Sequence, residues 1–169
     1  MTGEINHGHI DAVAEKPGKE RLRLVPFRRE HLERLRPRGF AAGSRYSLID
    51  LAPSLLCRAQ LGPAFTALLD GDAAAVAGVC HLCDGIGEAW ALVSPEVERV
   101  PISFHRAVSR RLARIGAENG FRRLLASVDV NDPRGMRWLE MLGFRRAGLM
   151  EAFGPHGENL YRYVKESGS

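Results

Sequence analysis

The clearest pattern of apolar and polar positions spans residues 87–119 and predicts a strand, a loop and an amphipathic helix. Residues 87–94 form an apolar run short enough to be a buried strand, and residues 95–100 read as a loop. The helix is expected to start at Pro101, since proline is tolerated best at the first helical position, and to end before Gly120. Helix N-termini attract anions, so this unit is the first candidate for a binding site.

The predicted helix has one apolar face and one basic face. Four apolar side chains share the face expected to be buried: Phe104, Val108, Leu112 and Ile115. Three arginines fall on the opposite face: Arg106, Arg110 and Arg114. No aromatic residues interleave with them for base stacking, and a solvated helix face explains them equally well. Specific nucleic-acid binding is therefore not predicted.

The residues before this unit predict one strand, two short helices and a β-hairpin. The second helix is interrupted by Pro53, which predicts a short or kinked helix, and the hairpin strands flank an Asp70-Gly71 turn. The expected elements are a strand at residues 21–25, helices at 31–36 and 47–60, and hairpin strands at 64–69 and 73–83.

The residues after Gly120 predict a parallel strand, a helix and a terminal hairpin. The strand covers residues 123–130, the helix runs from Asp132-Pro133 to Leu142, and the hairpin occupies residues 145–164. A strand, helix, strand succession normally forms a right-handed parallel crossover. These elements predict an α/β fold (an α+β mixed sheet) of about seven strands and three or four helices.

Length and composition indicate one globular domain. The 169 residues are 45% hydrophobic and 26% charged, which suits a single core, and no apolar run approaches membrane-spanning length. We expect this domain at residues 21–165, between a flexible tail at 1–20 and a short tail at 166–169. The polar N-terminus and three cysteines predict a cytoplasmic protein. The net charge of +4 would suit either nucleic acid or a phosphorylated cofactor.

Two sequence features suggest chemistry when taken alone. Cys80-His81-Leu82-Cys83 contains a C-x-x-C, but residues three apart on a strand point to opposite faces, so no metal site is predicted. Glu88 lies on the strand expected to be central, where a carboxylate could accept a proton from an amine. The alternative is that Glu88 lies near the strand end in water.

The order of these elements resembles that of the GNAT superfamily of acyl-CoA-dependent N-acetyltransferases. The most specific part of the likeness is residues 132–144, which end in Leu142-Gly143-Phe144 and look like the family's helix after the fifth strand. The hairpin at residues 66–78 looks like its second and third strands. In detail the chain looks closest to a phage-encoded branch.

The resemblance implies a fold, a cofactor and an activity. The cofactor would be acetyl-CoA, and the reaction would move its acetyl group to an amine of a small molecule or a protein. Neither specific nucleic acid nor a membrane is implied as a partner, and a homodimer is compatible with the likeness.

The resemblance also implies site residues. Glu88 would be the general base, and Tyr161 or Tyr163 would replace the tyrosine that many relatives use as general acid, because Leu139 occupies its position. The implied cofactor-binding residues are Trp90, Ala91, Leu92, Val93, Arg99, Ser103, Arg106, Asp132 and Trp138.

The chain departs from the family's pyrophosphate loop. It keeps Val93 and Pro95, but Glu98 aligns with the basic position and Pro101 with the first glycine. Pro101 has no N–H for a phosphate, and Glu98 would repel one. The alternative function is therefore a catalytically silent GNAT-fold protein that serves as a phage assembly or binding module.

Overall fold

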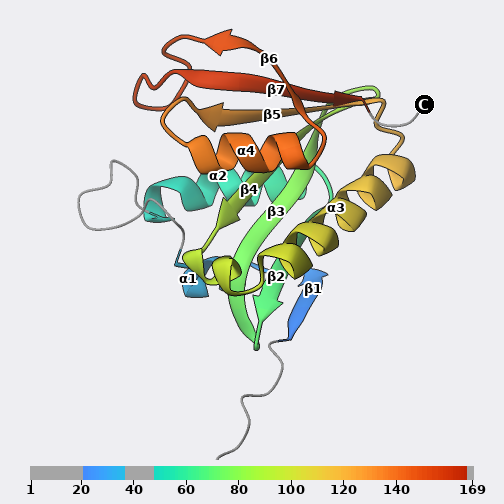
Figure 1. Ribbon diagram of the computed structural model, residues 1–169, viewed down its shortest axis with the longest axis vertical. Helices are drawn as coiled ribbons and strands as arrows, with labels where there is room; N and C mark the ends of the chain where they lie inside the picture. The colour runs from blue at the N-terminus through green and yellow to red at the C-terminus, as the bar shows by residue number, and fades with distance from the viewer. Residues whose placement is uncertain (1–20, 37–47, 167–169) are drawn as a thin grey trace, which may run out of the picture.

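The computed structural model describes residues 21–36 and 48–166, and these form one seven-stranded sheet with helices on both faces (Figure 1). The order across the sheet is β1-β2-β3-β4-β5-β7-β6, and the β4–β5 pair is parallel while the other neighbours are antiparallel. The strands are β1 (Leu22–Pro26), β2 (Ala64–Leu69), β3 (Asp72–Cys83), β4 (Ile86–Val93), β5 (Arg123–Asp129), β6 (Arg145–Met150) and β7 (Leu160–Glu166).

Helices α3 and α4 lie on one face of the sheet, and α1 and α2 lie on the other (Figure 1). Their bounds are α1 (Arg29–Arg34), α2 (Leu48–Gln60), α3 (Pro101–Glu118) and α4 (Pro133–Met141), with a 3-10 turn η1 (Pro95–Arg99). This architecture confirms the predicted mixed sheet of about seven strands. The predicted tail at residues 1–20 and the last three residues lie outside the described part of the chain.

The β2–β3 hairpin forms at the predicted turn. Leu69 pairs with Asp72, so Asp70 and Gly71 are the two loop residues, with φ angles of 52° and 96°. Two consecutive positive φ angles are the requirement of a type I′ turn, which Asp-Gly meets at low steric cost.

The prediction of a plain loop at residues 95–100 was wrong. This stretch forms η1, in which Pro95 is the first residue and the Ser94 hydroxyl oxygen accepts a hydrogen bond from Glu96 N at 3.3 Å. A serine cap followed by proline is a helix-start signal, and it favours a helical turn here.

Other element boundaries also differ from the predictions. Helix α1 begins two residues earlier than expected because the Arg28 N–H donates to His31 Nδ1 and closes its first turn. At the other end of the chain, β7 includes Glu166, which was assigned to the C-terminal tail. Helix α2 continues through Pro53 to Gln60, so of the two alternatives predicted for it, the short helix is wrong.

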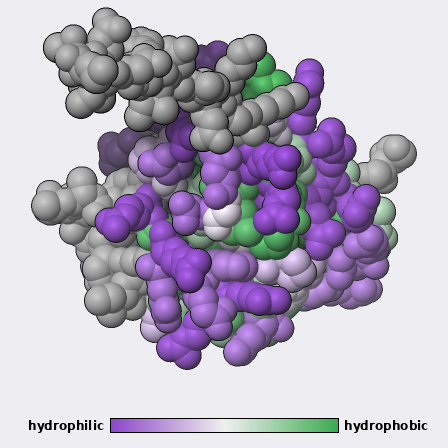
Figure 2. Space-filling model, turned by 90° about the horizontal axis from the view of Figure 1, so that it is seen from below, coloured by the Kyte–Doolittle hydropathy of each residue, from purple (hydrophilic) through white to green (hydrophobic). Residues whose placement is uncertain are grey.

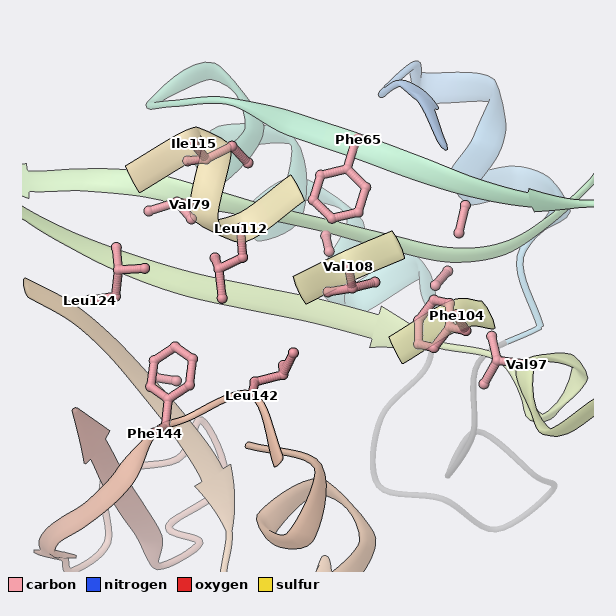
Figure 3. Close-up of a cluster of buried hydrophobic side chains, with 14 of the residues drawn as sticks. Phe65, Val79, Val97, Phe104, Val108, Leu112, Ile115, Leu124, Leu142 and Phe144 are labelled. Carbon is pink, nitrogen blue, oxygen red and sulfur yellow. The ribbon is translucent and has the colours of Figure 1, made fainter. Parts of the chain in front are cut away.

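The larger core lies between the sheet and the α3–α4 layer (Figure 3). The four α3 side chains predicted to be buried are all buried, and they point onto the sheet, with Leu142 and Phe144 following α4. The three arginines predicted on the opposite face are exposed. Helix α3 ends at Glu118, and the φ of 65° at the following Gly120 allows Phe121 N to donate to Gly116 O.

A smaller core joins the sheet to α1 and α2 and contains Leu32, Val76 and Trp90. At its edge, His31 Nδ1 lies 2.7 Å from the Thr66 hydroxyl and 3.2 Å from Arg28 N. Because the Arg28 N–H can only donate, Nδ1 acts as an acceptor and must be unprotonated in this arrangement. Burial lowers the pKa of His31 below its ordinary value, and the charge of Arg28 lowers it further.

We therefore expect acid to destabilise the fold through His31. A lowered pKa means that the unfolded chain binds the proton more readily, so this contribution to stability is complete above the ordinary histidine pKa. It is lost as pH falls through that value toward the lower pKa of the folded state. Urea unfolding at pH 7.5 and pH 5.5 should show a smaller pH dependence for His31→Gln than for the parent. An identical dependence in both proteins would contradict this assignment.

Candidate functional site

Strands β4 and β5 pair at one end and then separate, which opens the middle of the sheet. Their parallel register consists of three pairs, Ile86 with Arg123, Gly87 with Leu124 and Glu88 with Leu125. Beyond Glu88 and Leu125 the two strands run on without pairing to each other, to Val93 and Asp129. Because the backbone groups along this V-shaped opening are not paired between the two strands, it is a candidate ligand site.

A cavity of about 1060 Å³ occupies this opening and reaches both faces of the sheet. Such a volume is at the upper end of those found for small-molecule sites, so it can hold an extended ligand and a second molecule. On the α3–α4 face its wall includes Phe104, Val108, Val128, Trp138 and Leu142. On the α2 face its wall includes Leu51, Trp90, Leu92, Ser127 and Asp129.

The edge of β4 presents backbone groups to this cavity. Ser94 N donates to Ala74 O at 2.8 Å, which makes that pair a hydrogen-bonded one in the β3–β4 ladder. Because hydrogen-bonded pairs alternate along an antiparallel ladder, the N–H and C=O groups of Ala91 and Val93 point away from β3. They face the opening, and both residues line the cavity.

An ion pair lies at the end of the cavity near η1 and α3. Glu98, which was expected to repel a phosphate, forms an ion pair with Arg134 of α4, with Nη1 and Oε1 2.6 Å apart. Both residues line the cavity, as does His105, whose Nδ1 is buried and has no hydrogen-bond partner among the described residues. The charge of Glu98 is therefore compensated, and Arg134 brings a guanidinium group to the place where the loop lacks a basic residue.

Six of the nine predicted cofactor-binding residues line the cavity: Trp90, Ala91, Leu92, Val93, Asp132 and Trp138. Trp138 stacks on Phe104, with ring centroids 5.5 Å apart. Asp132 caps α4, because its Oδ1 accepts a hydrogen bond from Gly135 N at 2.9 Å.

The other three predicted cofactor residues lie outside the cavity wall. Arg99 contacts Asp70 at 3.4 Å and Glu96 at 3.5 Å, which turns it toward the β2–β3 hairpin. Ser103 and Arg106 are exposed on α3 and are not part of the lining.

Viewed from below, hydrophilic side chains cover most of the described surface, and hydrophobic residues show between them near the centre (Figure 2).

Glu88 lies at the closed end of the opening, and its side chain is 15% exposed. Oε2 is 3.0 Å from Arg58 of α2, and Oε1 is 2.9 Å from Arg162 of β7. The alternative of a solvated carboxylate is therefore wrong, because Glu88 is a largely buried ion pair with two guanidinium groups. It does not line the cavity, and its role as general base stays a prediction.

The two tyrosines considered as general acids point to the α3–α4 face. Tyr163 is fully buried, and its hydroxyl lies 3.3 Å from Glu140 and 3.4 Å from Arg146. Tyr161 is half-buried, with the Arg146 guanidinium 4.1 Å above its ring. Since Glu88 faces α2, the structure places Glu88 and Tyr161 on opposite sides of the sheet.

Five polar residues of the lining were not singled out from the sequence: Ser127, Asp129, Asn131, Arg134 and Glu158. A signal for two of them existed in the alternation of residues 123–129, where Leu124, Ala126 and Val128 face the larger core. Ser127 and Asp129 must then point to the α2 face. Nothing in the local pattern of these residues indicates that β4 separates from β5 and so brings Ser127 and Asp129 to the cavity wall.

The C-x-x-C motif lies at the end of β3, where the strand is irregular. Cys80 is buried and Cys83 is exposed, and a register shift between His81 and Cys83 breaks the simple alternation from which opposite faces were predicted. Burial raises the pKa of the Cys80 thiol, which disfavours the thiolate that a metal requires. Across residues 21–36 and 48–166, no three His, Cys, Asp or Glu side chains are grouped closely enough to hold a metal ion.

No protein-family model and no curated protein sequence matches the chain. Solved structures do match it. An N-acetyltransferase from Staphylococcus aureus Mu50 has a TM-score of 0.67 and 15% identity, covering 86% of this chain and 98% of that one. A GNAT-family acetyltransferase from Bacillus anthracis has a TM-score of 0.66 and 16% identity, covering 86% and 95%. Ard1 from Thermoplasma volcanium has a TM-score of 0.71 and 11% identity, covering 88% and 99%.

These likenesses establish the fold, which is that of the GNAT acyltransferases. They do not support the phage-encoded branch that the sequence suggested. In the part of the chain that the structure describes, no helix has the length and apolar character needed to span a membrane.

Proposed function

We propose that the chain is an N-acetyltransferase that moves an acetyl group from acetyl-CoA to an amine. The observation that carries this proposal is the cavity between β4 and β5, which reaches both faces of the sheet. Two molecules can enter it from opposite faces and meet in the middle. The fold shared with N-acetyltransferases supports the same function at a general level.

The residues around the cavity fit acetyl-CoA. The outward backbone groups of Ala91 and Val93 can bond the amide groups of the pantetheine arm, and apolar side chains such as Phe104 and Val128 can pack on it. Arg134 can approach the diphosphate from α4 and replace the contacts that Pro101 cannot make. The bound cofactor would supply an activated acetyl thioester.

The placement of Glu88 and Tyr161 on opposite faces suits the two proton transfers that the reaction needs. An amine that enters from the α2 side reaches the face on which Glu88 lies, so Glu88 can take its proton through water. Tyr161 is not part of the cavity wall, but it lies on the α3–α4 face, where the arm would lie, and can give a proton to the departing thiolate through water. Both roles are part of this proposal.

The direct test is calorimetric titration with acetyl-CoA, with Arg134 as the probe. Arg134→Met should bind about tenfold more weakly, because one charge-assisted hydrogen bond to a phosphate is lost. Glu98→Gln should bind more tightly than the parent, since it removes the carboxylate that competes for Arg134. Arg137→Met is the matched control, because Arg137 is exposed on α4 outside the cavity wall.

The second candidate function is a binding module that has lost the cofactor, and Pro101 is the feature that favours it. Proline at the start of α3 removes one N–H from the helix terminus that would face a diphosphate. If the parent and Glu98→Gln both fail to bind acetyl-CoA, this second function replaces the first. Binding without transfer to any amine in a broad panel would lead to the same conclusion.

A further inference from the structure

The α2 side of the cavity forms a chamber whose polar groups are arranged along the two separating strands. We call it the α2-side chamber. Its lining includes Trp90 and Leu92 from β4, Ser127 and Asp129 from β5, Leu51 from α2 and Pro155 from the β6–β7 loop. Trp90 and Ser127 each lie two residues beyond the last β4–β5 pair, so they lie on opposite edges of the opening.

Trp90 brings a buried hydrogen-bond donor to the α2-side chamber. Trp90 is 9% exposed, and its ring packs edge-on against Phe27, with ring centroids 6.4 Å apart. Among the described residues its Nε1 has no hydrogen-bond partner. An indole N–H can only donate, and leaving it unpaired in a buried place is unfavourable. A ligand oxygen that accepts this hydrogen bond would remove the penalty.

Ser127 brings a second unpaired polar group to the α2-side chamber. Its Oγ is buried and has no partner within the described part of the chain. Its register partner on β7 is Arg162, whose guanidinium contacts Glu88, so Ser127 points to the same face as that ion pair. A hydroxyl can donate and accept, so Ser127 can bond either a carbonyl oxygen or an amine of the ligand.

Asp129 gives the α2-side chamber negative charge. Its Oδ1 accepts a hydrogen bond from Asn131 N at 2.8 Å, and in residues 21–36 and 48–166 no cation forms an ion pair with it. Glu158 adds a second carboxylate to the lining, whereas the sole arginine or lysine among the described lining residues is Arg134, at the η1 end. The chamber thus favours a cation and disfavours an anion.

We propose that the α2-side chamber selects an acceptor amine that carries a neutral hydrogen-bond acceptor, an apolar body and no negative charge, as an α-amino amide does. This proposal rests on the proposed function and names its substrate class. The carbonyl oxygen pairs with Trp90 Nε1, the ammonium group lies near Asp129 and Ser127, and the apolar body packs on Leu51 and Leu92. A free amino acid would bring its carboxylate next to Asp129, and a simple alkylamine would leave Trp90 unpaired.

The test compares leucinamide, leucine and 3-methylbutylamine, which share one branched apolar body. Calorimetric titration of each into the full chain should give the tightest binding for leucinamide. Binding of 3-methylbutylamine should be about tenfold weaker, because one hydrogen bond is lost, and that of leucine weaker still. Equal affinity for leucine and leucinamide overturns the proposal.

Three variants test whether the preference for leucinamide arises in the α2-side chamber. Asp129→Asn keeps the acceptor for Asn131 N and removes the charge, so leucinamide should bind about tenfold more weakly. Trp90→Phe keeps a ring and removes the donor, so leucinamide should lose its advantage over 3-methylbutylamine. Ser127→Ala should weaken leucinamide binding severalfold, and this variant tests the chamber even if Trp90→Phe does not fold. Asp84→Asn is the control, because it removes one carboxylate in the exposed β3–β4 turn.

Titration of acetyl-CoA into the same samples separates the two proposals. Acetyl-CoA binding without any preference among the three amines overturns the substrate class and leaves the transferase function standing. A preference for leucinamide that depends on Asp129, in a protein that does not bind acetyl-CoA, supports the chamber and overturns the transferase function. Unchanged leucinamide binding in both Asp129→Asn and Ser127→Ala overturns the chamber.

Discussion

The Ala91→Trp variant is expected to fold like the parent and to bind acetyl-CoA roughly a hundredfold more weakly, a loss of about 2.7 kcal/mol or more. Ala91 is exposed, lies in the middle of β4 and lines the cavity on the α3–α4 side. Tryptophan is well suited to an extended strand, so the backbone can accept it. Its indole would occupy the space proposed for the pantetheine arm.

The control for this variant is Ala113→Trp, which adds the same side chain at an exposed position of α3 outside the cavity wall. Thermal unfolding of both variants should show midpoints close to that of the parent, and Ala113→Trp should keep its affinity for acetyl-CoA. If Ala91→Trp unfolds normally and still binds acetyl-CoA tightly, the cofactor does not use the opening between β4 and β5.

The second large effect is expected for stability. Glu88→Gln should lower the free energy of unfolding by about 2 kcal/mol, because the neutral amide leaves two guanidinium groups without their counter-charge in a largely buried place. The side-chain amide can accept from one arginine, while its NH₂ group meets the other. The effect should be smaller than for a fully buried pair, because Arg58 is 36% exposed.

Glu166→Gln is the matched control for Glu88→Gln. Glu166 also contacts two arginines, Arg123 at 3.0 Å and Arg145 at 4.0 Å, but its side chain is 53% exposed. Exposed ion pairs contribute little to stability, so in urea unfolding the free energy of unfolding should change by less than about 1 kcal/mol. Equal effects of the two substitutions would mean that the Glu88 ion pairs are no more important than surface ones. A loss of transfer activity in folded Glu88→Gln would support its role as base.

Local patterns predicted most of the fold because its elements carry strong local signals. The β2–β3 hairpin follows from the positive φ angles that Asp70-Gly71 readily adopts, and α3 follows from Pro101, its apolar face and Gly120. The placement of β7 between β5 and β6 could not be predicted in this way, because it depends on pairing between distant strands, which no local pattern encodes.

The candidate site was less predictable because its geometry is a tertiary property. The partners of Glu88 are 30 and 74 residues away in the chain, so the sequence showed a carboxylate on a strand but not the two arginines. Likewise, Arg134 lies 36 residues from Glu98, so the sequence did not show the guanidinium group that lies beside this carboxylate. Trp90 to Val93, which the resemblance implied as cofactor-binding residues, line the cavity, and their role in cofactor binding stays a prediction.

The early separation of β4 and β5 divides the sheet into a four-strand piece, β1 to β4, and a three-strand piece, β5, β7 and β6. Three residue pairs and the ion pair between Glu88 and Arg162 join the two pieces within the sheet. A molecule that lies across the opening touches both pieces and acts as an added cross-link in the folded state. A bound ligand should therefore raise the cooperativity of unfolding, and if the proposed cofactor binds here, the resistance of this protein to denaturation should depend on ligand concentration through mass action.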